Sequence, residues 1–404
     1  MTANSAVFDG SRSDLVVYFS GSRWDGPPGH DRRMAEALSR FRPVLFVDPP
    51  VSALTRFNHP ELGELLRRPR LRLHTSRLAH LVTQVVPGFS RPGIHRLVPP
   101  MVGRATRRAI RGLYGSTSGE PLAAVICSRF ENPGRPLPAQ RRVFYVTDDL
   151  VAGAEMVGLE RDWLLRQEAR SLRQADAVAV VSEAIQDRYA QDGFSTTLIP
   201  NGCQPDAYAE VDRAPLPAGV DLPGPVVGLL GHINERLDLT LLEAVADTGC
   251  SMLVVGPVAP GYDATRFLSL TRRPNVCWVG PKPYSEMSSY LRLIDVGLTP
   301  YADNAFNRAS FPLKTLEYLA AGRGVVATPL PAVTWLGTDL VSTAATPGEF
   351  AARVRDALAV PRTGELAARR QAFAREHGWD RRAEQLAELL GFDVAQTGAA
   401  RATT

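Results

Sequence analysis

Two adjacent acids and one lysine stand at positions where α/β proteins place catalytic and ligand-binding groups. Asp148 and Asp149 closely follow an apolar run, 143–146, that is typical of a buried strand. Lys314 lies in the first turn of a helix that the apolar spacing predicts over 312–321, between two predicted strands. The amides and the dipole of a first helical turn favour an anion. The pattern therefore predicts phosphate binding near the lysine, and it places the two acids at the carboxyl end of a strand.

The predicted helix at 312–321 has further residues that suit a ligand site. Ser310 is the predicted N-cap, and Gly322 suits the C-terminal end. Glu317 follows Lys314 by three residues, so that both side chains can face one ligand. The alternative is a plain ion pair between the two. Lysine is rare in this chain, since only Lys282 and Lys314 occur among 46 basic residues. We interpret the segment as a clamp for a pyrophosphate and a ribose.

Length and composition predict a globular protein of two or three domains, because the chain has 404 residues and is 45% hydrophobic. No apolar run approaches the roughly 20 residues that span a bilayer. The first 13 residues lack a signal-peptide pattern, which favours a cytoplasmic location. The cysteines lack metal-ligand spacing and are expected to be free thiols; they are Cys127, Cys203, Cys250 and Cys277. We predict no metal site and no cofactor.

Charge is concentrated in one part of the chain. From Arg32 to Arg111 there are 16 arginines and four acids, whereas the whole chain carries a net charge of only +4. Such a region favours an anionic partner. An anionic membrane surface contacted through Arg67–Arg111 is preferred to nucleic acid, because the segment has no interleaved aromatic residues. Peripheral association with the inner membrane face is thus one expectation, and solvated arginines without a partner are the alternative.

Strand and helix patterns alternate along most of the chain, which predicts an α/β fold of two doubly wound, Rossmann-like domains facing a cleft. The first predicted unit contains a glycine- and proline-rich loop, but no G-x-G-x-x-G motif. Asp48, at the end of its second strand, is therefore assigned to a cap or a loop. We place the domains at residues 1–212 and 213–378, with a crossing helix at 379–393 and a disordered tail at 394–404.

The second half of the chain resembles the GT-B glycosyltransferases, and within them the GT4-type, TuaH-like and glucuronosyltransferase-like enzymes of cell-surface polysaccharide and glycolipid assembly. Four motifs carry the resemblance in the expected order. They are I-P-N-G ending at Gly202, G-x-I-x-x-R-x-D from Gly231 to Asp238, the Pro300–Tyr301 pair, and S-x-P-x-K-x-x-E-Y from Ser310 to Tyr318. The first domain matches by its architecture and by a few positions only.

This resemblance implies a donor site in the second domain for a UDP- or GDP-linked sugar, and an acceptor site in the first. Glu317 would accept the ribose hydroxyls, Lys314 and Arg236 would neutralise the departing diphosphate, and the backbone around Lys282 and Tyr284 would read the nucleobase. No metal would be required. The implied donor-binding residues are Gly231, His232, Arg236, Lys282, Tyr284, Tyr301, Ser310, Phe311, Leu313, Lys314 and Glu317.

The sequence departs from the E-x7-E pattern of retaining relatives, because Ala309 stands where the first glutamate is expected. Retention or inversion at the sugar therefore stays open. An inverting enzyme needs a general base, and Asp148 or Asp149 is the candidate. Adjacent residues of an extended chain point in opposite directions, so only one of the two can face the acceptor. His30 is a further catalytic candidate, and Trp24 and Arg129 are candidates for the acceptor side.

The leading hypothesis is transfer of a sugar from a nucleotide sugar to an acceptor hydroxyl, with a glycan, a lipid-linked sugar or a small molecule as the acceptor. A soluble natural-product acceptor is one alternative. A sugar-nucleotide epimerase is another, although His232 is the only histidine of the second domain before its closing helices. A non-catalytic subunit that binds nucleotide sugars is the third, because the first glutamate is absent. Nucleic acid is not an expected partner.

Overall fold

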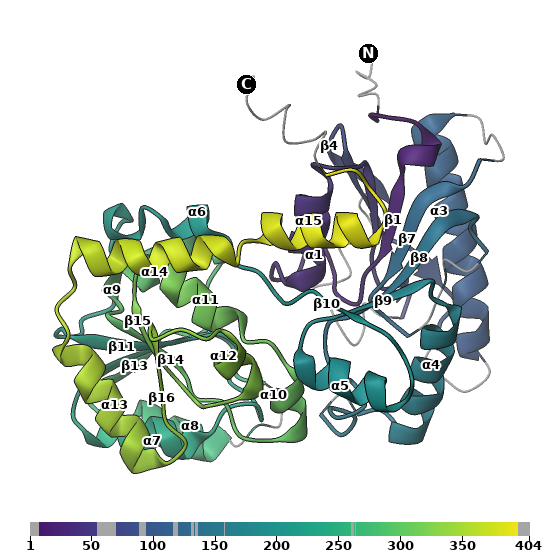
Figure 1. Cartoon of the computed structure of the whole chain (residues 1–404). Helices are drawn as coiled ribbons and strands as arrows, with labels where there is room; N and C mark the ends of the chain where they lie inside the picture. Colours follow the sequence, from purple (N-terminus) through teal and green to yellow (C-terminus); the bar gives the residue numbers. More distant parts are fainter. Residues whose placement is uncertain are drawn as a thin grey trace.

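The computed structural model describes residues 8–54, 70–88, 94–115, 120–130, 133, 136–156, 158–259, 262 and 264–394. Over these ranges the chain forms two lobes, each built on a parallel sheet with helices around it (Figure 1). The predicted fold class is confirmed. The predicted tail, 394–404, lies outside the described residues except for Val394, and the basic region is described only in part.

The N-terminal lobe contains an eight-stranded sheet in the order β10-β9-β8-β7-β1-β2-β5-β4. Neighbouring strands are parallel, apart from the antiparallel pair β4 and β5. The strand order reverses between β1 and β7, and such a reversal opens a crevice at the carboxyl ends of the strands. The strands are β1 (Val16–Phe19), β2 (Val44–Val47), β4 (Leu71–Thr75), β5 (Leu78–Leu81), β7 (Leu122–Cys127), β8 (Ala139–Val146), β9 (Ala177–Val180) and β10 (Thr197–Leu198).

Amphipathic helices cover this sheet, and a short two-stranded sheet of β3 (Val51–Ser52) and β6 (Gln84–Val85) lies beside it. Strands β1, β2, β5 and β7 are buried at every position, as expected for strands with both faces covered. The helices are α1 (His30–Leu38), α3 (Val98–Tyr114), α4 (Arg161–Gln174) and α5 (Glu183–Gln191), with 3-10 turns at Arg12–Asp14 and Ile94–Leu97.

The C-terminal lobe contains a six-stranded parallel sheet in the order β13-β12-β11-β14-β15-β16. This is the 3-2-1-4-5-6 order of a dinucleotide-binding domain, whose order reverses between its first and fourth strands. The reversal here lies between β11 and β14. The strands are β11 (Val226–Leu230), β12 (Ser251–Val255), β13 (Val276–Trp278), β14 (Val296–Thr299), β15 (Gly324–Ala327) and β16 (Val341–Thr343).

Helices flank this second sheet, and two of them meet the N-terminal lobe. The helices are α6 (Pro205–Tyr208), α7 (Leu239–Asp247), α8 (Ala264–Thr271), α9 (Met287–Leu293), α10 (Ala305–Ala309), α11 (Leu313–Ala320), α12 (Pro331–Trp335), α13 (Pro347–Ala359) and α14 (Gly364–Glu376), with 3-10 turns at Val211–Arg213 and Tyr284–Glu286. The two helices that meet the N-terminal lobe are α10 and α12, which both contact α5.

The last helix, α15 (Trp379–Leu389), leaves the C-terminal lobe and packs on α1 of the N-terminal lobe (Figure 1). The chain thus passes between the lobes twice. The two crossings are hydrogen-bonded to each other, because Cys203 N donates to His377 O at 3.0 Å and Trp379 N donates to Cys203 O at 3.0 Å. A Cβ on Gly202 would lie 2.9 Å from Trp379 N, so only glycine fits this close approach.

Candidate active site

A cavity of about 480 Å³ lies between the two lobes. Its walls come from the carboxyl ends of β1, β7 and β8 on one side and of β11 and β14 on the other, so that it joins the two crevices where the strand orders reverse. This is where open α/β sheets bind ligands. The predicted site residues that line it are His30, Asp148, Gly231, His232, Arg236, Tyr301, Ser310, Phe311, Leu313 and Lys314.

Asp148 faces the cavity and Asp149 does not. Burial raises the pKa of the Asp148 carboxyl to about 6, with Arg236 opposing this rise and Asp31 and Asp149 adding to it. The side chain is open to the cavity, while protein surrounds the site on its other sides. Asp149 is 5% exposed, accepts from Ala152 N at 2.9 Å and lies 3.3 Å from Arg188 Nε. Of the two adjacent acids, Asp148 is thus the one placed to exchange a proton with a ligand.

The helix that carries Lys314 begins later than predicted. Helix α11 starts at Leu313, and its N-cap is Pro312 without a side-chain cap bond. Ser310 does not cap it, because its hydroxyl donates to Phe306 O at 2.9 Å and closes α10. The predicted C-terminal glycine is confirmed, since Gly322 has a φ of +72° and Arg323 N donates back to Tyr318 O at 2.9 Å.

Lys314 lines the cavity from the first turn of α11, and its ammonium lies 2.6 Å from Glu317 Oε2. Burial lowers the pKa of Lys314, but the charge and the hydrogen bond of Glu317, together with Tyr301 and Tyr284, outweigh that effect, so the net shift is upward. Glu317 is not among the residues that line the cavity. The structure therefore shows the ion pair that was the alternative to a shared ligand site.

Arg236 reaches the cavity from the loop after β11, and its orientation is fixed by Asn307. Arg236 Nε donates to Asn307 Oδ1 at 3.0 Å, while Asn307 Nδ2 donates back to Arg236 O at 2.9 Å. The guanidinium also lies over the rings of Tyr301 and Phe306, at 5.3 and 5.1 Å from their centroids. Its two terminal nitrogens make no hydrogen bond within the described part of the chain, so they can meet an anion in the cavity.

A second histidine and a glycine complete this wall. His232, which lines the cavity, has its pKa lowered by burial and by the positive charges of Lys314 and Arg236, so it is neutral at pH 7. Gly231 lies at a φ of +137°, and a Cβ on Gly256 would meet Gly231 O at 1.8 Å. The backbone at this wall of the cavity therefore depends on two glycines.

Lys282 and Tyr284 lie outside the cavity lining. Lys282 is exposed and lies 6.0 Å from the ring centroid of Tyr290. The Tyr284 hydroxyl is 2.7 Å from that of Tyr208, and Arg33 lies 5.0 Å from the Tyr284 ring centroid. Tyr284 thus joins the C-terminal lobe to α1. The resemblance implied a different role for this segment, which is to contact the nucleobase.

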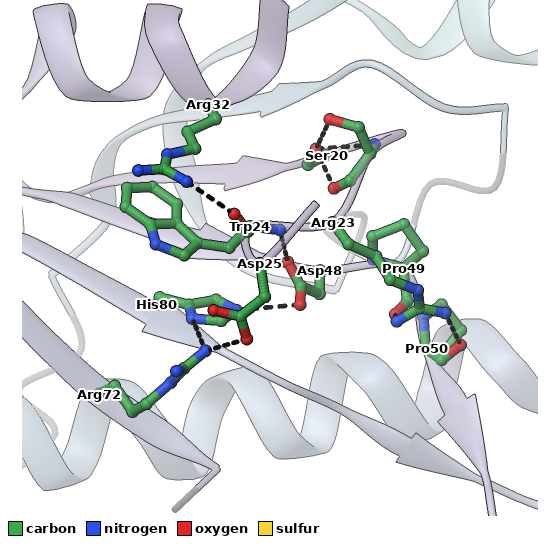
Figure 2. A network of polar contacts seen from close by, with 11 residues as sticks. Ser20, Arg23, Trp24, Asp25, Arg32, Asp48, Pro49, Pro50, Arg72 and His80 are labelled. Atoms are coloured by element: carbon green, nitrogen blue, oxygen red, sulfur yellow. Dashed lines mark hydrogen bonds and ion pairs between the residues drawn. The ribbon is translucent and has the colours of Figure 1, made fainter. Parts of the chain in front are cut away.

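Trp24, a predicted acceptor-side residue, does not line the cavity. Trp24 is 5% exposed and stacks on His74 and His80, with ring centroids 4.3 and 5.6 Å apart. Its backbone N donates to Asp48 Oδ1 at 2.9 Å, and Asp48 Oδ2 lies 2.9 Å from His80 Nε2 (Figure 2). This network fixes the loop between β1 and α1, and it confirms the loop assignment of Asp48.

Arg129 is also absent from the cavity between the lobes. It lines a separate, small cavity on the N-terminal lobe together with Arg142, and its guanidinium lies 5.8 Å from the ring centroid of Phe19. Position 129 directly follows Ser128, which does line the large cavity. The sequence located the correct strand end, but the alternation of side chains directs the next residue to the other side of the chain.

Comparison with known proteins now adds to this geometry. Residues 224–359, from just before β11 to the end of α13, match the sequence model of a family described as glycosyl transferases group 1. The matched residues make up most of the C-terminal lobe and include Arg236 and Lys314. TuaH of Bacillus subtilis (strain 168), whose name assigns it to teichuronic acid biosynthesis as a glycosyltransferase, is 32% identical over 224 residues. These residues are 51% of this chain and 56% of TuaH, so the match spans little more than half of either protein.

Solved structures show the same fold over nearly the whole chain. Sucrose-phosphate synthase (tll1590) of Thermosynechococcus elongatus aligns with a TM-score of 0.69 at 18% identity, covering 96% of this chain and 100% of that one. Alr3699/HepE of Anabaena, in complex with UDP-glucose, aligns with a TM-score of 0.60 at 16% identity, covering 93% and 99%. The region that matches the glycosyltransferase group 1 model is thus one of two lobes in a fold that these structures share.

Three residues that shape the site were not predicted. Asn307 holds Arg236, and Asn201 contacts His30 from the hinge between the lobes. Asp31 is 4% exposed at the cavity wall and accepts from Tyr18, Ser20 and Gly21. Asn201 belongs to the I-P-N-G motif, and Asp31 directly follows the predicted site residue His30. Their places in the sequence could therefore have indicated both residues. Asn307 lies in helix α10, which was not predicted. No sequence pattern indicated that it contacts Arg236 in the loop after β11.

Proposed function

We propose that this chain is a glycosyltransferase that moves a sugar from a nucleotide-sugar donor to an acceptor hydroxyl. One observation carries the proposal: a carboxylate with a raised pKa, Asp148, and two cations, Lys314 and Arg236, line a single cavity from opposite lobes. An acid–base group and an anion site on facing walls suit the transfer of a group away from a diphosphate. The match to the glycosyltransferase group 1 model covers the segment that contains Arg236 and Lys314, and it supports the anion site.

The reaction that fits these residues is a displacement at the anomeric carbon. The acceptor oxygen forms a bond to that carbon while the bond to the diphosphate oxygen breaks. The acceptor proton passes to the Asp148 carboxylate, and the electron pair leaves with the nucleoside diphosphate. Lys314 and Arg236 stabilise the negative charge that develops on this leaving group. Because two side-chain cations are available for that role, we propose that no metal ion is required, and full activity in EDTA is the expected result.

A UDP-linked sugar is the first donor to test, with GDP-linked sugars as the alternative. The support is the likeness in fold to the Anabaena protein whose structure contains UDP-glucose. For the acceptor, the likeness to TuaH favours cell-surface polysaccharide or glycolipid assembly. A soluble acceptor remains the competing proposal, and it differs in predicting no binding to membranes.

A two-stage experiment tests the activity. A thermal-shift screen of UDP- and GDP-sugars identifies the donor, because a ligand at one hundred times its Kd stabilises the folded state by about 2.7 kcal/mol. Donor hydrolysis or transfer is then measured for wild type, Lys314→Ala and Asp148→Asn. We expect Lys314→Ala to reduce the thermal shift, and Asp148→Asn to retain the shift but lose turnover. Binding without any turnover in wild type would favour a non-catalytic subunit, and interconversion of two nucleotide sugars would favour an epimerase.

Peripheral membrane association is a finer proposal that rests on α3. One face of this helix is buried through Val102, Thr106 and Ala109, while the other exposes a row of arginines, Arg104, Arg107, Arg108 and Arg111. None of these four makes an ion pair within the described residues. An unpaired cationic row can bind anionic headgroups at about 1 kcal/mol per residue. No helix in the described ranges is long and apolar enough to cross a bilayer.

Sedimentation with vesicles tests this surface. We expect binding to vesicles that contain phosphatidylserine at low salt, release at high salt, and loss of binding when the four arginines of α3 are changed to glutamate. The matched control is the double variant Arg272→Glu and Arg355→Glu, which reverses exposed charges on the C-terminal lobe. Absence of binding at low salt, or equal loss in the control variant, would contradict the proposal and favour a soluble acceptor.

A further inference from the structure

Asn201, in the hinge between the lobes, forms hydrogen bonds to both of them. Its Nδ2 donates to Phe311 O at 3.0 Å, two residues before α11 begins, and its Oδ1 lies 2.6 Å from His30 Nδ1 at the start of α1. Asn201 is 6% exposed, so neither bond competes with much water. One side chain therefore connects the segment that precedes Lys314 to the histidine on the opposite wall of the cavity.

These contacts determine where the proton of His30 lies. A backbone carbonyl can only accept a hydrogen bond, so the amide nitrogen of Asn201 must face Phe311 and its oxygen must face the histidine. His30 Nδ1 must then carry the proton, which leaves Nε2 as a bare acceptor. Burial lowers the pKa of His30, with Asp31 and Asn201 opposing this, which keeps the ring neutral at pH 7.

His30 lines the cavity, and its Nε2 is buried and has no hydrogen-bond partner among the described residues. The ring cannot easily turn, because Tyr145 and Trp379 pack edge-on against it with centroids 4.6 and 5.3 Å away. A buried acceptor without a donor is unfavourable, so it marks a place where a donor from a ligand is expected. A sugar hydroxyl is the natural donor in a cavity for nucleotide sugars.

We propose that Asn201 is a positioning residue that couples the donor segment before α11 to His30. It holds the ring in the Nδ1–H form, so that Nε2 can accept a hydrogen bond from a substrate hydroxyl. It also transmits a shift of the Phe311 carbonyl, caused by a nucleotide bound at α11, to the opposite wall of the cavity. This inference rests on the proposed function for its ligand, whereas the protonation state of His30 can be measured without any ligand.

Two variants separate the two bonds of Asn201. Asn201→Asp keeps an oxygen toward His30 but cannot donate to Phe311 O, and Asn201→Ala removes both contacts. Gln204→Ala is the matched control, because Gln204 lies three residues further along the hinge and its side chain makes no hydrogen bond to the described residues. Long-range proton–nitrogen correlation spectra of protein labelled with 15N-histidine identify which ring nitrogen carries the proton, and His30→Gln assigns the signal among the seven histidines.

We expect the Nδ1–H form in wild type, Asn201→Asp and Gln204→Ala, and its loss in Asn201→Ala. Adding UDP or GDP should shift the His30 nitrogen signals in wild type and Gln204→Ala, and by less than half as much in Asn201→Asp. The donor kcat/KM should fall about tenfold in Asn201→Asp, as for one lost hydrogen bond. An Nε2–H form in wild type would overturn the proposal, and so would equal nucleotide responses in wild type and Asn201→Asp. If neither nucleotide changes the Tm of wild type, the proposed function itself fails together with the coupling, while the protonation result still stands.

Discussion

Lys314 Nζ lies 2.6 Å from Glu317 Oε2, one turn further along α11, and this pair is the point where the cavity meets the helix that should hold the donor. Glu317 raises the pKa of Lys314 against the effect of burial. The ammonium is thereby kept charged in a site with little solvent. A diphosphate that enters the cavity meets a cation that already has one anionic partner, so the two residues must be tested separately.

Lys314→Ala should weaken UDP or GDP binding by about 10- to 100-fold. The reason is that a hydrogen bond to a charged group contributes about 1.5–3 kcal/mol. The only other lysine gives the control: Lys282 is exposed outside the cavity lining, so Lys282→Ala should change the Kd by less than about twofold. Isothermal titration calorimetry measures both. Equal losses in the two variants would mean that general positive charge, rather than the α11 site, holds the nucleotide.

Glu317→Gln distinguishes a ribose-binding role from a purely structural one. If Glu317 accepts ribose hydroxyls, the neutral amide should weaken nucleotide binding by about tenfold, because bonds to a charged acceptor are the stronger ones. If it serves only Lys314, removal of a negative charge near the diphosphate should strengthen binding instead. We expect the weaker binding. The same titration with inorganic pyrophosphate, which has no ribose, should show no such loss.

Asp148→Asn should lower kcat by about 10²- to 10⁴-fold, the usual contribution of a general base, with little effect on nucleotide affinity. Its neighbour is the matched control. Asp149 pairs with Arg188, which also binds Glu168 through two hydrogen bonds of 2.8 Å, so Asp149→Asn should lower the Tm more than the kcat. The reverse result, with turnover lost in Asp149→Asn and kept in Asp148→Asn, would show that Asp149 is the base and contradict the proposal.

The pKa of about 6 for Asp148 gives a definite pH dependence. A base acts in its deprotonated form, so kcat/KM should be low below pH 5, rise through about pH 6 and level off above pH 7. The midpoint lies above the ordinary aspartate value of 3.8, because burial disfavours the charged form. Arg236 opposes that rise, so Arg236→Gln should move the midpoint to higher pH. A midpoint near pH 4 in wild type would show that another group limits the rate.

Much of the fold was predictable because buried parallel strands appear as short apolar runs. The predicted apolar run 143–146, for example, forms the buried end of strand β8. The loops before functional helices were predicted less well. The start of α11 was placed one residue early with Ser310 as its cap, whereas Ser310 is the C-cap of the preceding short helix α10.

The site was predicted where a motif fixed both the residue and its element, as for Lys314 and Arg236. The sequence could not place side chains whose orientation depends on contacts from distant parts of the chain. Trp24 is held by His74 and His80, which are about fifty positions further along, and no local pattern shows that stack. Asp148 and Asp149 could not be separated by sequence, since the choice depends on Arg188, which lies about forty positions beyond them.

Tyr318 links the stability of the C-terminal sheet to the shape of the site. Its hydroxyl accepts from Leu230 N at 2.8 Å and donates to Gly228 O at 3.1 Å, next to Gly231 at the cavity wall. Tyr318→Phe leaves that buried N–H without its partner, so we expect a loss of about 1–3 kcal/mol in the free energy of unfolding and weaker nucleotide binding. Tyr290→Phe is the control, because the hydroxyl of this buried tyrosine makes no hydrogen bond to the described residues, and its removal should cost less than about 0.5 kcal/mol. Urea unfolding followed by circular dichroism measures both variants, and equal losses would show that the hydroxyl of Tyr318 does not support the strand end.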